Sequence, residues 1–158
     1  MTLCAKDVMV TAFDKIDENA SIEQAIQMIS NGRVRKTGHK TISLMVTDYS
    51  DKLVGVITMF DILYHLRPAF LNYGIDGDQL PWKGQLDTFI RDLKAKKVKQ
   101  VMSTDVMGAS LDEHLMVLLD RMIKNKYRRL PVLENNKPIT PDEYTEILFH
   151  LWQKFCDI

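Results

Sequence analysis

The sequence predicts an α/β fold made of two copies of one small unit, each a three-stranded sheet with two helices, packed as a pseudo-two-fold pair. The first observation behind this prediction is an internal repeat: an offset of 93 aligns Lys6-Asp7-Val8-Met9 with Lys99-Gln100-Val101-Met102. The second is the pattern of the first copy, which reads as strand, helix, strand, strand, helix. Each copy alone is small for a stable core, so we expect the two to fold as one cooperative unit.

The first helix of each copy shows the repeat most clearly. Apolar residues recur at helical spacing in both copies, and they align at the same offset: Ile22, Ala25 and Ile29 with Leu115, Leu118 and Met122. Ser21 and Gln24 have the spacing of a capping box, and Gly32 stands where the helix would stop. In the second copy Ser110 and Glu113 are the candidate caps.

The strands follow this helix. The offset falls to 86 because residues 35–41 have no counterpart in the second copy, which indicates a surface loop. The short apolar runs at 42–46 and 128–132 predict buried strands. In the first copy the β-branched run 53–57 predicts a third strand, and residues 59–66 predict a helix.

The second copy departs from this pattern in its third strand. Only Pro138 and Ile139 stand between the preceding turn and Thr140, so the strand is short and contains a proline. Thr140-Pro141-Asp142-Glu143 has the residues of a helix start, which predicts a final helix from Pro141 to Phe155. We therefore expect domains at 1–66 and 98–158, joined by a linker at 67–97 that holds one helix, Leu86 to Lys96.

Composition limits the class of protein. The 158 residues carry 21 Lys plus Arg and 21 Asp plus Glu, so no net charge favours nucleic acid or an anionic membrane. Apolar stretches are broken by charge before membrane-spanning length, and Lys6 and Asp7 lie where a signal peptide would be apolar. Cys4 and Cys156 have no nearby ligand set and predict neither a disulfide framework nor a zinc site. We expect a cytoplasmic protein that binds neither membranes nor nucleic acid.

The segment Gly55-Val56-Ile57-Thr58-Met59-Phe60-Asp61 carries a resemblance to a known family. It resembles the Gly-hydrophobic-hydrophobic-Thr/Ser-x-x-Asp signature of the CBS domain, and the two Val-Met openings and Arg129-Leu130-Pro131-Val132 support the match. The resemblance covers most of the chain outside the linker. It implies a tandem CBS pair, or Bateman module, that senses AMP, ADP, ATP or a related adenosyl compound in a cleft between the repeats.

The signature also has a physical interpretation. A strand that turns directly into a helix at Thr58 places a hydroxyl and the Asp61 carboxylate at a helix N-terminus, where free amides favour anions. The carboxylate can accept hydrogen bonds from a ribose diol. The alternative is a plain capping box, in which both side chains only satisfy the helix amides. Gly55 would let a ligand or a neighbouring backbone approach closely.

The remaining candidate site residues follow from the resemblance. It implies that the adenine lies between apolar strand edges, where Met45 and Val56 are the candidates, and that Arg128 and Arg129 reach the phosphates. For the two arginines, solvated charges near a helix end are an equally good interpretation. The second copy lacks the Gly and aligns ambiguously at Glu143 or Glu146, so we expect at most one nucleotide site per chain.

Other motifs do not predict chemistry. The sequence holds no phosphate-binding loop, GxGxxG or GxSxG motif, and its four histidines are far apart. We therefore expect no enzyme, no metal and no cofactor other than the nucleotide as a ligand. The resemblance implies a homodimer formed through the CBS modules and a regulated partner protein that the sequence does not identify. A module that dimerises or binds a partner without any ligand is the alternative.

Overall fold

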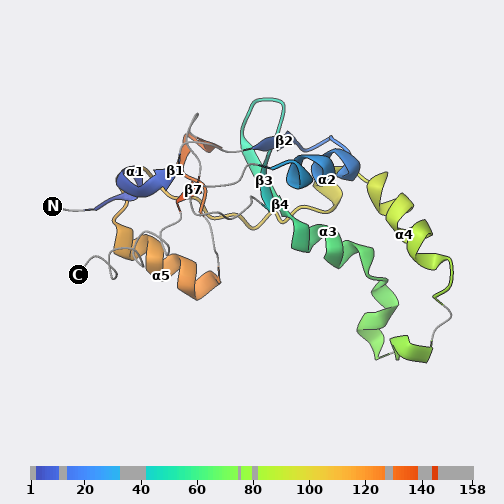
Figure 1. Cartoon of the computed structure of the whole chain (residues 1–158). Coiled ribbons are helices and arrows are strands. Elements are labelled where there is room, and N and C mark those ends of the chain that lie inside the picture. Colours follow the sequence, from blue (N-terminus) through green and yellow to red (C-terminus); the bar gives the residue numbers. More distant parts are fainter. Residues whose placement is uncertain are drawn as a thin grey trace. The chain divides into compact units, whose positions relative to one another are not determined.

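The computed structural model describes residues 3–10, 14–32, 42–74, 76–79, 82–126, 130–138 and 144–145 (Figure 1). The chain forms two compact units. One contains 14–48 and 54–104, and the other contains 1–13, 49–53 and 105–158. The opening segment of each copy therefore lies with the other copy, an exchange that the repeat alone does not reveal.

The first unit is built on a three-stranded sheet in the order β2-β3-β4, with β2 Lys15–Asp17, β3 Ser43–Thr47 and β4 Leu53–Thr58. Strands β2 and β3 are parallel, and Ile16 is the partner of Val46. Every residue of β3 is buried, as expected for a central strand of apolar composition. The strands expected at 42–46 and 53–57 are confirmed as β3 and β4, and β2 is the first strand of the expected unit, whose bounds the sequence did not give.

Two helices of the first unit have the boundaries that local signals predict. Helix α2, Ile22–Ser30, begins with the predicted capping box: Ser21 Oγ accepts from Gln24 N–H at 3.1 Å, and Gln24 Oε1 accepts from Ser21 N–H at 3.2 Å. Helix α3, Met59–Leu66, follows β4 without a loop. The direct junction places the start of α3 at the end of a partly buried strand.

The linker is helical over part of its length. Two 3-10 turns, η1 Ala69–Tyr73 and η2 Gly77–Gln79, precede helix α4, Gln85–Lys94, and η3 Val98–Gln100 follows it. Trp82 stacks on Phe70 with ring centroids 6.3 Å apart and donates from Nε1 to the Gly77 carbonyl at 2.6 Å. The sequence predicted a linker helix at 86–96, which corresponds to α4, but not the 3-10 turns.

The core of the first unit includes residues from both copies. Its buried side chains are Ile16, Ile22, Ala25, Ile29, Leu44, Val46, Ile57, Ile62, Leu93, Val98 and Val101. The last two come from the opening of the second copy. Its backbone joins the sheet, because Val56 N–H donates to Ser103 O at 3.0 Å and Ser103 N–H donates to Val56 O at 2.9 Å.

The described part of the second unit holds helix α1 Ala5–Val8, helix α5 Leu115–Asn125 and four short strands. The strands form two antiparallel pairs: β1 Met9–Val10 with β7 Tyr144–Thr145, and β5 Leu133–Glu134 with β6 Lys137–Pro138. The hairpin turn uses Asn135 and Asn136, both with positive φ, as the tight turn between β5 and β6 requires. The core of the second unit contains the buried residues Ala5, Ala109, Leu115, Leu118, Met122 and Leu130.

Two sequence predictions are wrong in this unit. Residues Tyr144 and Thr145 lie in a strand, so the helix expected from Pro141 to Phe155 does not exist there; pairing with β1 overrides the local helix-start pattern. The rest of that segment lies outside the described residues. The N-cap of α5 is His114, not Ser110, because residues 110–113 form a turn before the helix and Glu113 pairs with Arg121.

Candidate functional site

The predicted site residues Thr58 and Asp61 meet at the junction of β4 and α3. Thr58 is the N-cap of α3, and its hydroxyl accepts from Asp61 N–H at 3.1 Å. In return Asp61 Oδ2 accepts from both Thr58 N–H and Thr58 Oγ1, each at 2.8 Å. The capping box, which was the structural alternative, is therefore formed, and it fixes the orientation of the Asp61 carboxylate.

The second carboxylate oxygen of Asp61 faces a residue that the sequence analysis did not single out. Ser103 Oγ donates to Asp61 Oδ1 at 3.0 Å. Ser103 lies directly after the second Val-Met opening, 42 positions from Asp61 in the sequence. The repeat pointed to this opening, because Val101-Met102 aligns with Val8-Met9. Only the exchange of opening segments shows that Ser103, the next residue, reaches the Asp61 carboxylate of the first copy.

The first-turn amides of α3 are mostly occupied. Thr58 N–H binds Asp61 Oδ2, Met59 N–H donates to Ile42 O at 3.0 Å, and Asp61 N–H binds Thr58 Oγ1. In the described part of the chain this leaves the Phe60 N–H as the amide of this turn that can donate to a bound anion. The start of α3 thus offers one donor beside one carboxylate.

Gly55 is buried in β4, and the structure shows what approaches it. A Cβ at this position would lie 2.7 Å from Met102 Sδ and 2.8 Å from Ser103 O. Of the two interpretations made from the sequence, a neighbouring backbone is therefore the one that the described contacts support. Gly55 lets the segment at 102–103 pair closely with β4, and so it helps to place the Ser103 hydroxyl on Asp61.

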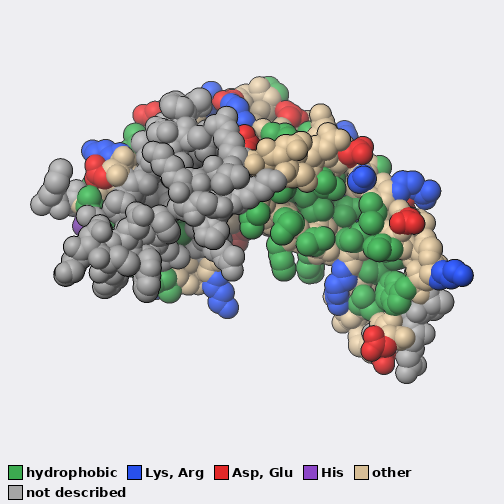
Figure 2. All heavy atoms as spheres, in the orientation of Figure 1, with side chains coloured by type: hydrophobic (Ala, Val, Ile, Leu, Met, Phe, Trp, Pro, Cys, Tyr) green, Lys and Arg blue, Asp and Glu red, His purple; other side chains and the backbone are tan. Residues whose placement is uncertain are grey.

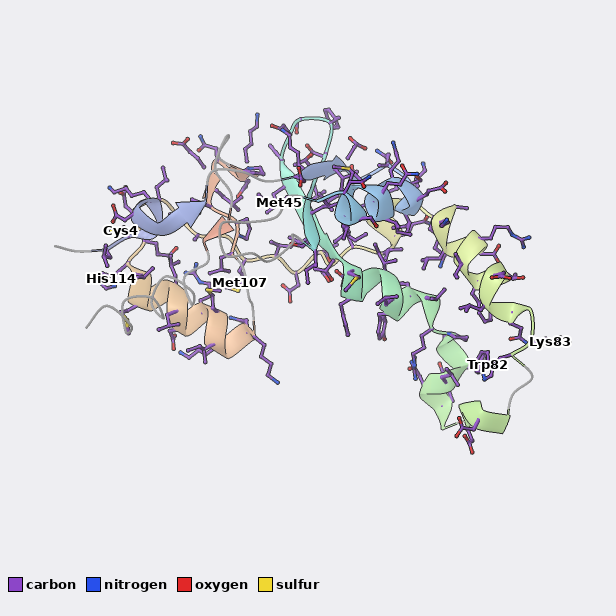
Figure 3. The ribbon with its side chains drawn as sticks, in the orientation of Figure 1. Cys4, Met45, Trp82, Lys83, Met107 and His114 are labelled. Carbon is purple, nitrogen blue, oxygen red and sulfur yellow. The ribbon has the colours of Figure 1, made fainter. Side chains whose placement is uncertain are left out.

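The other predicted site residues differ in accessibility. Met45, on strand β3 (Figure 3), is fully buried, whereas Val56 on β4 is half-buried. Arg128 and Arg129 lie outside the described residues. The structure thus brings Thr58 and Asp61 together, whereas Gly55 and Val56 lie earlier in β4, against the 102–103 segment.

A separate pocket of about 360 Å³ lies at the end of α3, beside η1 and α4. Neither Thr58 nor Asp61 contributes to it. Its lining combines aromatic, apolar and charged side chains: Tyr64, His65, Leu66, Arg67, Pro68, Ala69, Asn72, Phe89, Asp92, Leu93 and Lys96.

The described ranges hold neither a cluster of metal-ligand side chains nor a helix that could cross a membrane. No group of three or more His, Cys, Asp or Glu side chains is gathered there as metal ligands would be. Within the same ranges no helix has the length and hydropathy needed to cross a bilayer.

Comparison with known proteins bears on this geometry. A model of the CBS domain family matches residues 5–68 and 98–139. Three solved structures are similar over nearly the whole chain. The first is the CBS domain pair of protein MJ0100 in complex with 5′-methylthioadenosine and S-adenosyl-L-methionine, with 19% identity and a TM-score of 0.65 over 98% of this chain and 99% of that one. The second is CBSX2 in complex with AMP, with 22% identity and a TM-score of 0.66 over 95% of this chain and 97% of that one. The third is a putative acetoin utilization protein, AcuB, from Vibrio cholerae, with 14% identity and a TM-score of 0.68 over 99% of this chain and 95% of that one. A search of curated protein sequences gave no match. At these identities the structural matches show the fold.

Proposed function

Because this chain belongs to the CBS domain family, we propose that it is a regulatory module that binds an adenine nucleotide or a related adenosyl compound. The observation that carries the proposal is the Asp61 carboxylate, held in one orientation at the start of α3 by Thr58. A fixed carboxylate accepts hydrogen bonds from a ribose diol at little further entropic cost. Of the similar structures, one is a complex with AMP and another a complex with 5′-methylthioadenosine and S-adenosyl-L-methionine, which supports this class of ligand.

The bound ligand would use the groups around this carboxylate. The ribose would lie on Asp61 and Thr58, and a phosphate would accept from the Phe60 amide. Val56 is half-buried and accessible to a planar base, whereas the fully buried Met45 could contribute only by supporting the strand from within. Arg128 and Arg129 remain our candidates for the outer phosphates.

A thermal-shift screen of the purified protein against AMP, ADP, ATP, S-adenosylmethionine and NADH tests the proposal. A ligand at about a hundred times its dissociation constant stabilises the folded state by about 2.7 kcal/mol. A selective rise in the unfolding temperature is the expected result and would identify the ligand class. No rise with any of these compounds would refute adenosyl binding.

The second candidate function is a ligand-free module that dimerises or binds a partner protein. It is favoured by the sequence of the second copy, in which only Pro138 and Ile139 stand between the turn and Thr140 and no glycine takes the position of Gly55. Under this alternative no nucleotide changes either thermal stability or the oligomeric state.

We also propose that two copies of the chain associate through α3, in either case. Four apolar side chains of this helix are exposed: Met59 48%, Phe60 73%, Leu63 54% and Tyr64 54%. Figure 2 shows hydrophobic side chains gathered over this part of the molecule. An apolar helix face left in water is typical of an interaction surface. Light scattering should give the mass of a dimer for the natural chain and of a monomer for Phe60→Asp; a wild-type monomer would refute this association.

The role that we propose is regulatory and not catalytic, and we place the protein in the cytoplasm. A partner protein would respond to the changes in packing that ligand binding causes. Purified protein should not turn over a bound nucleotide. Release of ADP, phosphate or adenosine from ATP or AMP at a rate that follows protein concentration would contradict this.

A further inference from the structure

We propose that Ser103 determines how strongly the Asp61 site distinguishes a ribose from a 2′-deoxyribose. This inference rests on the proposed function, since it concerns the same carboxylate. Ser103 comes from the opening of the second copy and belongs to the same compact unit as Asp61. Its hydroxyl occupies part of the surface that a ribose would need.

The hydrogen bonds that Asp61 already accepts limit how many a ribose can donate to it. An ionised carboxylate has about four lone-pair positions, two on each oxygen. Oδ2 already accepts two hydrogen bonds from Thr58, one from its N–H and one from its hydroxyl. Oδ1 accepts one from Ser103. In the described structure one position is therefore left, on Oδ1, whereas a ribose diol donates two hydrogen bonds.

Ser103 is the donor that can leave at the smallest cost. The hydrogen bonds from Thr58 belong to the capping box of α3, so releasing them would weaken the start of the helix. Ser103 is exposed, and water can replace the contact of its hydroxyl. Rotation about its Cα–Cβ bond frees Oδ1 without moving the backbone, which stays paired with Val56.

The two sugars therefore differ in what they displace. A 2′-deoxynucleotide presents only the 3′-hydroxyl and can use the free position while Ser103 stays in place. A ribonucleotide gains a second hydrogen bond only by giving up the one from Ser103. The contact from Ser103 thus reduces the advantage of the 2′-hydroxyl and widens the range of sugars that the site accepts.

The experiment is a calorimetric titration of the full chain, as wild type, Ser103→Ala and Ser103→Thr, with AMP, ATP and their 2′-deoxy forms. Removing the hydroxyl should tighten binding of the ribonucleotides about three- to tenfold, the net value of one exposed hydrogen bond. Binding of the 2′-deoxy forms should change less than about twofold. Ser103→Thr keeps a hydroxyl and should keep the wild-type ratio between the two sugars.

The outcomes separate this inference from the proposed function. If Ser103→Ala weakens ribonucleotide binding, or changes both sugars equally, Ser103 assists the ligand or only supports the fold, and the inference is wrong although the site stands. If the wild type binds none of the four nucleotides, the adenosyl site itself is refuted and this inference with it. Unfolding temperatures of the three proteins show that each is folded.

Discussion

Replacing Gly55 with alanine tests the packing that places Ser103 on Asp61. The added Cβ would lie 2.8 Å from Ser103 O and 2.7 Å from Met102 Sδ, well inside the 3.5–4.0 Å at which non-bonded carbon atoms pack best. The half-buried Met102 side chain can turn away. The Ser103 carbonyl cannot recede without losing its hydrogen bond from Val56 N–H at 3.0 Å.

The expected cost follows from these two terms. Overpacking a well-packed site costs about 1–3 kcal/mol, and loss of one backbone hydrogen bond adds about 0.5–1.5 kcal/mol. We therefore expect Gly55→Ala to lower the free energy of unfolding by about 2–4 kcal/mol. Urea denaturation followed by circular dichroism measures this as a lower midpoint with an unchanged slope.

Gly77→Ala is the matched control. Its Cβ would lie 3.5 Å from Leu71 Cδ2 and 3.8 Å from Trp82 Cζ2, which are ordinary contacts. Its effect should stay within about 0.5 kcal/mol. If Gly55→Ala unfolds at the same urea concentration as Gly77→Ala, the close approach of the 102–103 segment to β4 is refuted.

Three further predictions concern a helix cap, a core side chain and an ion pair. Ser21→Ala removes the hydroxyl of the α2 capping box and should cost about 0.5–2 kcal/mol in urea unfolding; no loss would show that the cap does not contribute. Leu118→Ala, in the core of the second unit, should cost about 2–5 kcal/mol, whereas the neighbouring half-exposed Val117→Ala should cost much less; equal costs would contradict the assigned face of α5. The hydrogen bond and charge of Asp112 raise the pKa of Lys6 above 10.5. Because the pKa of Lys6 is higher in the folded state than in the unfolded state, the contribution of this pair to stability is complete below pH 10.5 and is lost as the pH rises through the raised pKa. Asp112→Asn should return the pKa of Lys6, measured by NMR titration, towards 10.5. An unchanged pKa would refute the pairing.

Local signals predicted the helices of the first copy well. The boundaries of α3 agree with the predicted 59–66, and the capping box of α2 forms between Ser21 and Gln24 as expected. Such features depend on residues within one turn of each other, so their spacing in the sequence contains the necessary information.

The features that depend on pairing between distant segments of the chain could not be predicted from the sequence. The contact between Ser103 and Asp61 depends on the exchange of opening segments, which an internal repeat does not specify, because the repeat shows that two units exist but not which opening packs on which core. The strand at Tyr144–Thr145 forms by pairing with Met9–Val10, more than a hundred residues away in the sequence, against a local pattern that favours a helix. In both cases tertiary hydrogen bonds decide the structure.

A titration of AMP and ATP into two capping-box variants shows whether the Asp61 carboxylate binds the ribose of an adenosyl ligand. Asp61→Ala and Gln24→Ala each remove the third-position side chain of a capping box, on α3 and α2 respectively, so they cost similar stability. We expect Asp61→Ala to weaken binding at least about tenfold, the value of one hydrogen bond to a charged group, because the second hydrogen bond from the ribose replaces the one from Ser103. Gln24→Ala should stay within about twofold of the wild type. Undiminished binding by a folded Asp61→Ala protein would contradict binding of the ribose by Asp61.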